Sequence, residues 1–93
     1  MAVPPIRYLV SFTGHVQGVG FRVTAVQQSR GLDVHGTVCN ESDGSVTMDV
    51  EGSPSDLKEL VRRIESVMSR KLDGTVIDTR NPIGRTGGVA IKK

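Results

Sequence analysis

The chain has 93 residues, 37% of them hydrophobic and 24% charged, which suits one globular domain over residues 1–93 with one hydrophobic core. Its formal net charge of +2 comes from dispersed basic residues, a pattern that speaks against a nucleic-acid partner. Cys39 is the only cysteine, which excludes an intrachain disulfide and a multi-cysteine metal site, and no apolar run is long enough to span a membrane.

The first two expected elements flank a glycine-rich loop. Residues 7–13 alternate, with Tyr8, Val10 and Phe12 on one face, and this alternation predicts a half-buried strand. After the loop, apolar residues recur at helical spacing over 21–30, which predicts a helix. The chain therefore begins with a strand, a loop and a helix.

Two further strands are expected to form a hairpin. Val34 and Val38 are in phase in the strand predicted over 34–40, and apolar and polar residues alternate over 45–51. The dipeptide Asp43-Gly44 between them is a strong hairpin signal. The two segments are therefore predicted to pair as antiparallel strands.

The second half begins with the clearest helix, predicted over 54–70, where Pro54 suits the first helical position. Six apolar side chains at helical spacing are expected to face the core: Leu57, Leu60, Val61, Ile64, Val67 and Met68. A strand is expected over 74–79, a loop over 80–88 and a short final strand over 89–93.

The order of these elements predicts the fold class. Each strand needs its apolar face covered, and two helices of these lengths can cover one face of a four-stranded sheet. The order strand–helix–strand–strand–helix–strand predicts an α+β, ferredoxin-like sandwich (βαββαβ). We expect a four-stranded antiparallel sheet with both helices on one face.

The loop "GHVQGVG" and the residues after it are suited to bind an anion. Gly14, Gly18 and Gly20 tolerate positive φ, so that backbone N–H groups can turn inward together and a ligand can approach closely. The first N–H groups of the following helix lack internal partners and carry the positive end of its dipole. Arg22 in the first turn adds a planar guanidinium that matches phosphate oxygens. Together these features predict a cradle for one phosphoryl group.

A plainer interpretation stays open on these residues alone. The glycines could merely make a tight connection between strand and helix, with Arg22 solvated. Two familiar phosphate motifs do not apply, because no Gly-Lys-Ser/Thr follows and the spacing differs from G-x-G-x-x-G.

The stretch "GHVQGVGFR", residues 14–22, resembles the signature of the acylphosphatase family. In that signature a glycine, any residue, then Val-Gln-Gly-Val, one more residue, Phe and Arg form the phosphate loop. A second stretch, "GTVCNESDGSV" over 36–46, resembles the family's second motif and puts Asn40 in the position of its asparagine. The resemblance covers residues 5–70, in the order of elements given above.

The resemblance implies hydrolysis of an acyl phosphate to a carboxylate and inorganic phosphate. It implies two catalytic residues, Arg22 to hold the phosphoryl group and Asn40 to orient the attacking water. The loop supplies the implied phosphate-binding residues: His15, Val16, Gln17, Gly18, Val19, Gly20, Phe21 and Arg22. No metal and no cofactor is expected, because the loop has no carboxylates and the nearest ones, Glu41 and Asp43, are expected in a turn. A strong general base is not needed, because the substrate's own phosphate can take the proton of the water.

Other residues receive plainer expectations. His15 is expected to be exposed, and Gln17 to brace the loop through hydrogen bonds. His35 is expected to be solvated on the open face of the sheet, and Cys39 to be a partly exposed thiol. The C-terminal third, residues 71–93, departs from the family's usual aromatic-rich pattern, so that its effect on stability or activity is left open.

Three functions are open at this point, while the organism and the physiological acyl phosphate cannot be read from these residues. The favoured one is a cytoplasmic, monomeric acylphosphatase that acts on a small-molecule acyl phosphate, with inorganic phosphate as product and competitive inhibitor and without membrane or nucleic-acid partners. The second is a non-catalytic phosphate- or protein-binding module of the same fold. The third is a carbamoyl-phosphate-handling domain fragment, as in hydrogenase-maturation carbamoyltransferases; those continue into cysteine pairs, whereas this sequence stops at Lys93.

Overall fold

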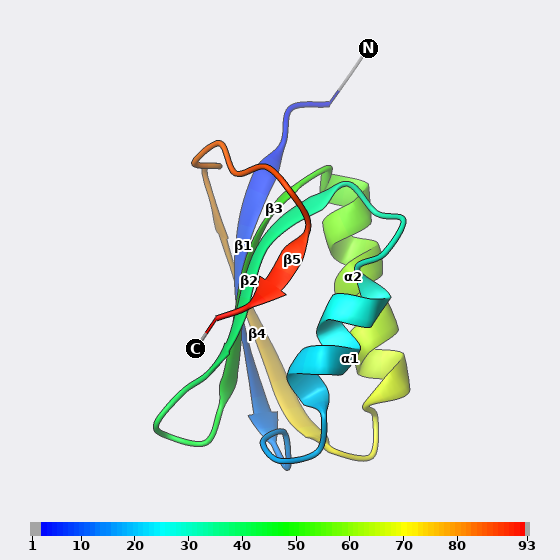
Figure 1. Cartoon of the computed structure of the whole chain (residues 1–93), viewed down its shortest axis with the longest axis vertical. Coiled ribbons are helices and arrows are strands. Elements are labelled where there is room, and N and C mark those ends of the chain that lie inside the picture. The colour runs from blue at the N-terminus through cyan, green and yellow to red at the C-terminus, as the bar shows by residue number, and fades with distance from the viewer. Residues whose placement is uncertain (1–2, 93) are drawn as a thin grey trace.

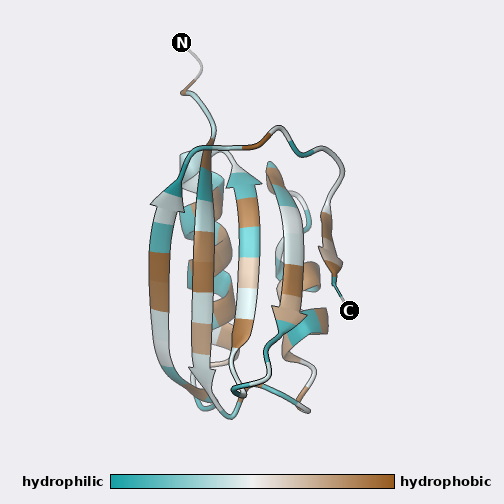
Figure 2. Ribbon diagram, turned by 90° about the vertical axis from the view of Figure 1, so that its left-hand side faces the viewer, coloured by the Kyte–Doolittle hydropathy of each residue, from teal (hydrophilic) through white to brown (hydrophobic). Residues whose placement is uncertain are grey.

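Two helices lie against one face of a five-stranded sheet in the computed structural model, which describes residues 3–92 (Figure 1). The elements in chain order are β1 (Ile6–Gly14), α1 (Phe21–Gln28), β2 (Val34–Asn40), β3 (Val46–Gly52), α2 (Pro54–Val67), β4 (Leu72–Arg80) and β5 (Val89–Ile91). The strands lie in the order β4-β1-β3-β2-β5, and the face away from the helices is open (Figure 2). None of the helices within the described residues is long and apolar enough to cross a membrane.

The expected ferredoxin-like arrangement is confirmed, but the expected four-stranded antiparallel sheet is wrong by one strand. β1, β2, β3 and β4 pair antiparallel, whereas β5 pairs parallel with the outer edge of β2. Consecutive strands usually lie beside one another. Here the chain instead crosses from β4 at one edge to β5 at the other (Figure 2). Local patterns within "VAIKK" predict a strand but not this distant partner.

The core lies between the sheet and the helices, as the alternation in 7–13 predicts. Tyr8, Val10 and Phe12 are all buried against the helices. Five of the six side chains expected on the inner face of α2 are also buried, but Val67 is 56% exposed, so that prediction is wrong. At about 100° per residue, Val67 lies about 80° around the helix from Leu57, at the margin of the apolar stripe.

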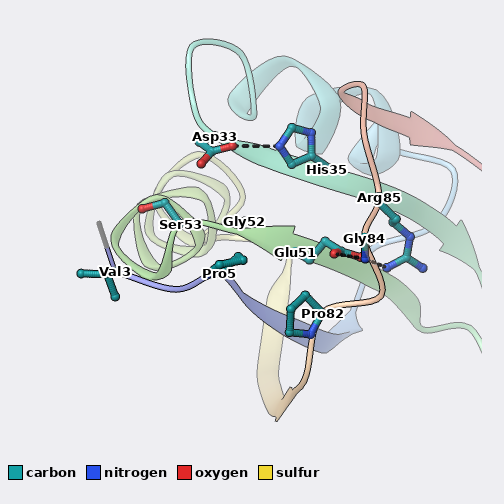
Figure 3. Close-up of a pocket in the computed structure, with 10 residues that line it drawn as sticks. All are labelled: Val3, Pro5, Asp33, His35, Glu51, Gly52, Ser53, Pro82, Gly84 and Arg85. Atoms are coloured by element: carbon teal, nitrogen blue, oxygen red, sulfur yellow. Dashed lines mark hydrogen bonds and ion pairs between the residues drawn. The ribbon is translucent and has the colours of Figure 1, made fainter. Parts of the chain in front are cut away.

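The expected loop over 80–88 is anchored to the sheet by charged groups. We call residues 81–88 the strap, because they run from β4 to β5 at one end of the molecule (Figure 1). The amides of Ile83 and Gly84 donate to the carboxylate of Glu51 at 3.1 and 2.9 Å. Figure 3 shows Gly84 and Arg85 of the strap beside Glu51. Arg85 donates to Glu51 at 3.2 Å and to Asp49 at 2.9 Å. The strap is therefore held by carboxylates of β3.

Asp49 lies between two guanidinium groups. Arg7 donates to both of its oxygens, at 2.8 and 2.9 Å, and Arg85 approaches from the strap. The hydrogen bonds from Arg7, joined by those from Arg85, outweigh the effect of burial and hold the pKa of Asp49 well below its usual range. For Glu51, burial alone would raise the pKa, but the hydrogen bonds from the amides of Gly84 and Ile83 lower it on balance.

His35 contacts the strap from β2, so the expectation that it is solvated is wrong. Its Nδ1 meets the carbonyl oxygen of Gly87, and its Nε2 lies 2.8 Å from a carboxylate oxygen of Asp33. Both partners are acceptors, so both ring nitrogens are satisfied only when both carry hydrogen. The bond to Gly87, followed by that to Asp33, raises the pKa of His35. Its stabilising contribution is therefore present below the ordinary value of about 6.5 and is lost as the pH rises through the raised value.

Replacing Asp49 by Asn should lower the free energy of unfolding at pH 7 by about 1–2 kcal/mol, because Arg7 and Arg85 lose a partly buried carboxylate. The folded pKa of Asp49 is lowered, so its contribution is present above the unfolded value of about 3.9 and is lost as the pH falls below it. Urea melts should therefore show the difference from the wild type shrinking between pH 7 and pH 3. Glu65→Gln, at an exposed position of α2, is the control, and a difference that is constant with pH would contradict the assignment.

Candidate functional site

The glycine loop begins where β1 meets the start of β4. The pairing of β1 with β4 shifts register at Thr13 and Gly14, and Gly14 adopts a φ of 120°. A Cβ at Gly14 would lie 2.4 Å from the carbonyl oxygen of Lys71, so only glycine fits there. That carbonyl oxygen accepts the amide of His15 at 2.9 Å. The first residue of the loop is thus fixed to the neighbouring chain segment.

Two apolar side chains hold the loop on the core. Val16 and Phe21 are 1% and 2% exposed, and the Phe21 ring packs against that of Phe12 with centroids 4.9 Å apart. Because these side chains are buried, Val16 and Phe21 can offer a ligand only their backbones. The loop is therefore held at both ends by the hydrophobic core.

Between these anchors, backbone N–H groups are left without protein acceptors. Gly18 and Gly20 have φ of 75° and 76°, in the left-handed region that favours glycine. Within residues 3–92, no acceptor pairs with the amides of residues 16–20, and the first turn of α1 has further amides without intrahelical partners. The amide of His15 already binds the carbonyl oxygen of Lys71, so it is not among these donors. The amides of residues 16–22 remain as donors for an anion.

Arg22 lies in the first turn of α1, directly after these amides. It is half-buried, and no ion pair of its guanidinium occurs in the part of the chain that the structure describes. The N-terminal end of a helix also favours negative charge. The arrangement therefore suits a dianion bound to the backbone and to one cation.

Asn40 lies at the last position of β2, where it pairs with Val46 of β3. Its side-chain oxygen Oδ1 is buried, and within residues 3–92 it has no hydrogen-bond partner. The hairpin that follows Asn40 lies at the same end of the molecule as the glycine loop (Figure 1). Within residues 3–92, this oxygen is therefore a buried polar atom of Asn40 without a protein partner, at the strand end that leads into the hairpin.

Gln17 joins the loop to this hairpin. Its Nε2 donates to the carbonyl oxygens of Glu41 and Ser45, at 2.7 and 2.9 Å. The expectation that Gln17 braces the loop through hydrogen bonds is therefore confirmed.

The remaining expectations are partly met. His15 is exposed, as expected, and Cys39 is half-buried with its thiol 3.3 Å from the carbonyl oxygen of Asn40. The strap contacts of His35 and Arg85 were missed by sequence reasoning. Each joins residues more than 30 positions apart, and a lone histidine or arginine carries no local pattern that would identify its partner.

Two cavities lie away from the glycine loop. One of about 350 Å³ lies beneath the strap (Figure 3). The charged side chains that line it pair with one another, His35 with Asp33 and Arg85 with Glu51. Another of about 540 Å³ lies on the open face of the sheet and includes Thr37 and Cys39. Neither is lined by residues 14–22 or by Asn40. Across the described residues, no three His, Cys, Asp or Glu side chains gather as a metal site would require.

Comparisons with known proteins identify a family for most of the chain. The family model described as Acylphosphatase matches residues 8–82. An acylphosphatase of Salinibacter ruber is 47% identical over 58 residues, which are 62% of this chain and 61% of that protein. An acylphosphatase of Anaeromyxobacter dehalogenans is 34% identical over 88 residues, 94% of this chain and 95% of that protein. The chain thus spans about three fifths of the first relative and nearly all of the second.

A solved structure supports the fold. The acylphosphatase from Bacillus subtilis matches with a TM-score of 0.83 and 22% identity, over 95% of this chain and 99% of that chain. At this identity the likeness concerns the fold alone.

Replacing Gly18 by Ala should weaken the binding of inorganic phosphate, measured by calorimetric titration. At both Gly18 and Gly31 the φ is positive and a Cβ would meet no protein atom within 4 Å. Alanine at either position should therefore cost a similar backbone strain of about 1–2 kcal/mol. Only at Gly18 would the methyl group also stand where we expect the phosphate, so an equal loss of phosphate binding in Gly31→Ala would contradict the placement.

Proposed function

Because the chain belongs to the acylphosphatase family, we propose that it hydrolyses acyl phosphates to a carboxylate and inorganic phosphate. The observation that carries the proposal is the set of loop amides directly before Arg22 that have no acceptor within residues 3–92. We assign this activity to one acylphosphatase-like domain over residues 1–93. We further propose a cytoplasmic monomer that needs no metal or cofactor and no membrane or nucleic-acid partner.

The phosphoryl group is held by the backbone and one side chain. Amides of residues 16–22 donate to its non-bridging oxygens, and the guanidinium of Arg22 binds two of them as a planar fork. Charge gathers on these oxygens as the bond to the acyl group breaks. Donors that are already in place stabilise that charge without further reorganisation.

Asn40 positions the nucleophile. Its neutral carboxamide, which has both a donor and an acceptor, forms a hydrogen bond with a water molecule and directs a lone pair of the water oxygen at phosphorus. As the new P–O bond forms, the P–O bond to the acyl group breaks and the carboxylate leaves with its electron pair. The proton of the water passes to a phosphate oxygen. A strong general base is not needed, because a carboxylate is a good leaving group.

Arg22→Ala should abolish measurable turnover of benzoyl phosphate and weaken inhibition by inorganic phosphate by about 10- to 100-fold. A charge-assisted hydrogen bond contributes about 1.5–3 kcal/mol. Arg22→Lys should show little more turnover than Arg22→Ala, because the point charge of an ammonium group cannot replace the planar guanidinium. Arg70→Ala, at an exposed position after α2, is the control for charge alone, and an equal effect there would contradict the assignment.

Asn40→Ala should lower kcat by about 100-fold or more, by analogy with other catalytic hydrogen-bonding groups, while inhibition by inorganic phosphate stays near the wild-type level. Stopped-flow absorbance with benzoyl phosphate measures both quantities. Asn81→Ala, in the exposed strap, is the matched control. Full activity in Asn40→Ala would remove the role of Asn40 in orienting water. Phosphate binding without turnover in the wild type would instead favour the non-catalytic module.

A further inference from the structure

We propose that Gln17 is a positioning residue that fixes Asn40 relative to the phosphate loop. The inference rests on the proposed function and extends it, because it concerns how two separate parts of that site are held in register. Gln17 lies within the loop, while Asn40 belongs to another strand, and Gln17 bonds to residues on either side of the turn that follows Asn40.

The chemistry of the contact fixes the orientation of the Gln17 side chain. Its two partners, the carbonyl oxygens of Glu41 and Ser45, can only accept hydrogen bonds. The NH₂ group must therefore face these two oxygens, and it donates one hydrogen to each. A side chain without these donors, or with a negative charge, could not make the contact.

The turn that Gln17 holds is cross-linked within itself. The amide of Glu41 donates to the carbonyl oxygen of Ser45 at 2.8 Å, and that of Gly44 to the carbonyl oxygen of Glu41 at 3.2 Å. Asp43 accepts both the amide and the hydroxyl of Ser45, at 3.0 and 2.6 Å. Because of these hydrogen bonds, residues 41–45 form a rigid turn. A shift of Glu41 or Ser45 therefore moves the whole turn.

Asn40 stands at the base of this unit. It directly precedes Glu41 and pairs with Val46, which directly follows Ser45. A displacement of the turn thus moves the ends of β2 and β3, and with them the side chain of Asn40. Without Gln17, the carbonyl oxygens of Glu41 and Ser45 each keep one backbone donor. Loss of the contact should therefore loosen the hairpin without unfolding it.

The first test replaces Gln17 by Met, which has a similar length but no hydrogen-bond donor. We expect kcat for benzoyl phosphate to fall about 10-fold, while KM and inhibition by inorganic phosphate change less than about 2-fold. Gln27→Met, at an exposed position of α1, is the matched control and should behave like the wild type. A loss confined to KM would overturn the proposal, because it would place Gln17 in phosphate binding alone.

A double-mutant cycle with Asn40→Ala tests whether Gln17 acts through Asn40. If it does, adding Gln17→Met to Asn40→Ala should leave kcat unchanged within about 2-fold. A further 10-fold loss in the double variant would show independent action and overturn the proposal.

Gln17→Glu adds a readout that general loosening would not change. A carboxylate facing two carbonyl oxygens repels them, whereas a protonated carboxyl can donate to one. The ratio of kcat in this variant to that of the wild type should therefore rise by several-fold between pH 8 and pH 5. A ratio that is flat with pH would count against the proposal.

An NMR measurement separates failure of this inference from failure of the proposed function. Gln17→Met should shift the side-chain NH₂ signals of Asn40 and speed hydrogen exchange at Glu41, and Gln27→Met should do neither. If the wild type does not hydrolyse benzoyl phosphate, the proposed function fails while these signals still decide the coupling. Unchanged Asn40 signals in an active protein would overturn the coupling alone.

Discussion

The site depends on a short run of backbone that keeps its N–H groups free while its ends stay fixed. A protein chain normally pairs its amides, and only a conformation with positive φ turns several of them to one side. Gly18 and Gly20 supply that conformation, and the buried side chains of Val16 and Phe21 prevent the loop from collapsing onto other acceptors. The hydrophobic core thus maintains a set of backbone donors that have no acceptor among the residues that the structure describes.

The two ends of the sheet differ in whether their polar groups are paired. At one end lie the loop and the hairpin with unsatisfied donors and an unsatisfied acceptor, and at the other the strap has its charges paired (Figure 1). The strap also leads into β5, whose following residue Lys92 donates its amide to the carbonyl oxygen of Val38 at 2.8 Å. This bond lies two residues before Asn40. The paired charges at one end therefore help to fix the strand that carries Asn40 at the other.

Patterns that act over a few residues predict the structure well. Alternation placed Tyr8, Val10 and Phe12 in the core, and Asp43-Gly44 marked the hairpin, because each signal arises from neighbouring side chains. The partner of β5 and the contacts of His35 were not predictable in this way. They depend on how the chain returns across the sheet, and nothing in the sequence near His35 specifies Gly87 as its acceptor. For the proposed site, the resemblance of two motifs predicts the loop, Arg22 and Asn40, but it does not predict the contacts that join the loop to the hairpin.

A cradle built from main-chain amides constrains the residues that set the backbone conformation more than it constrains the side chains that face the ligand. An amide N–H is present in every residue but proline, so a substitution within the loop removes a donor only by changing the backbone conformation or by blocking the approach of the ligand. The exposed side chain of His15 is thus free of this demand, whereas the glycines and the core anchors are not, and Val19 packs in part against the core. The same reasoning gives Gln17 its importance, since its side chain is the element of the loop that reaches the hairpin. The backbone conformation of the loop fixes its donors relative to one another. Their position relative to the hairpin depends on the contact that Gln17 makes.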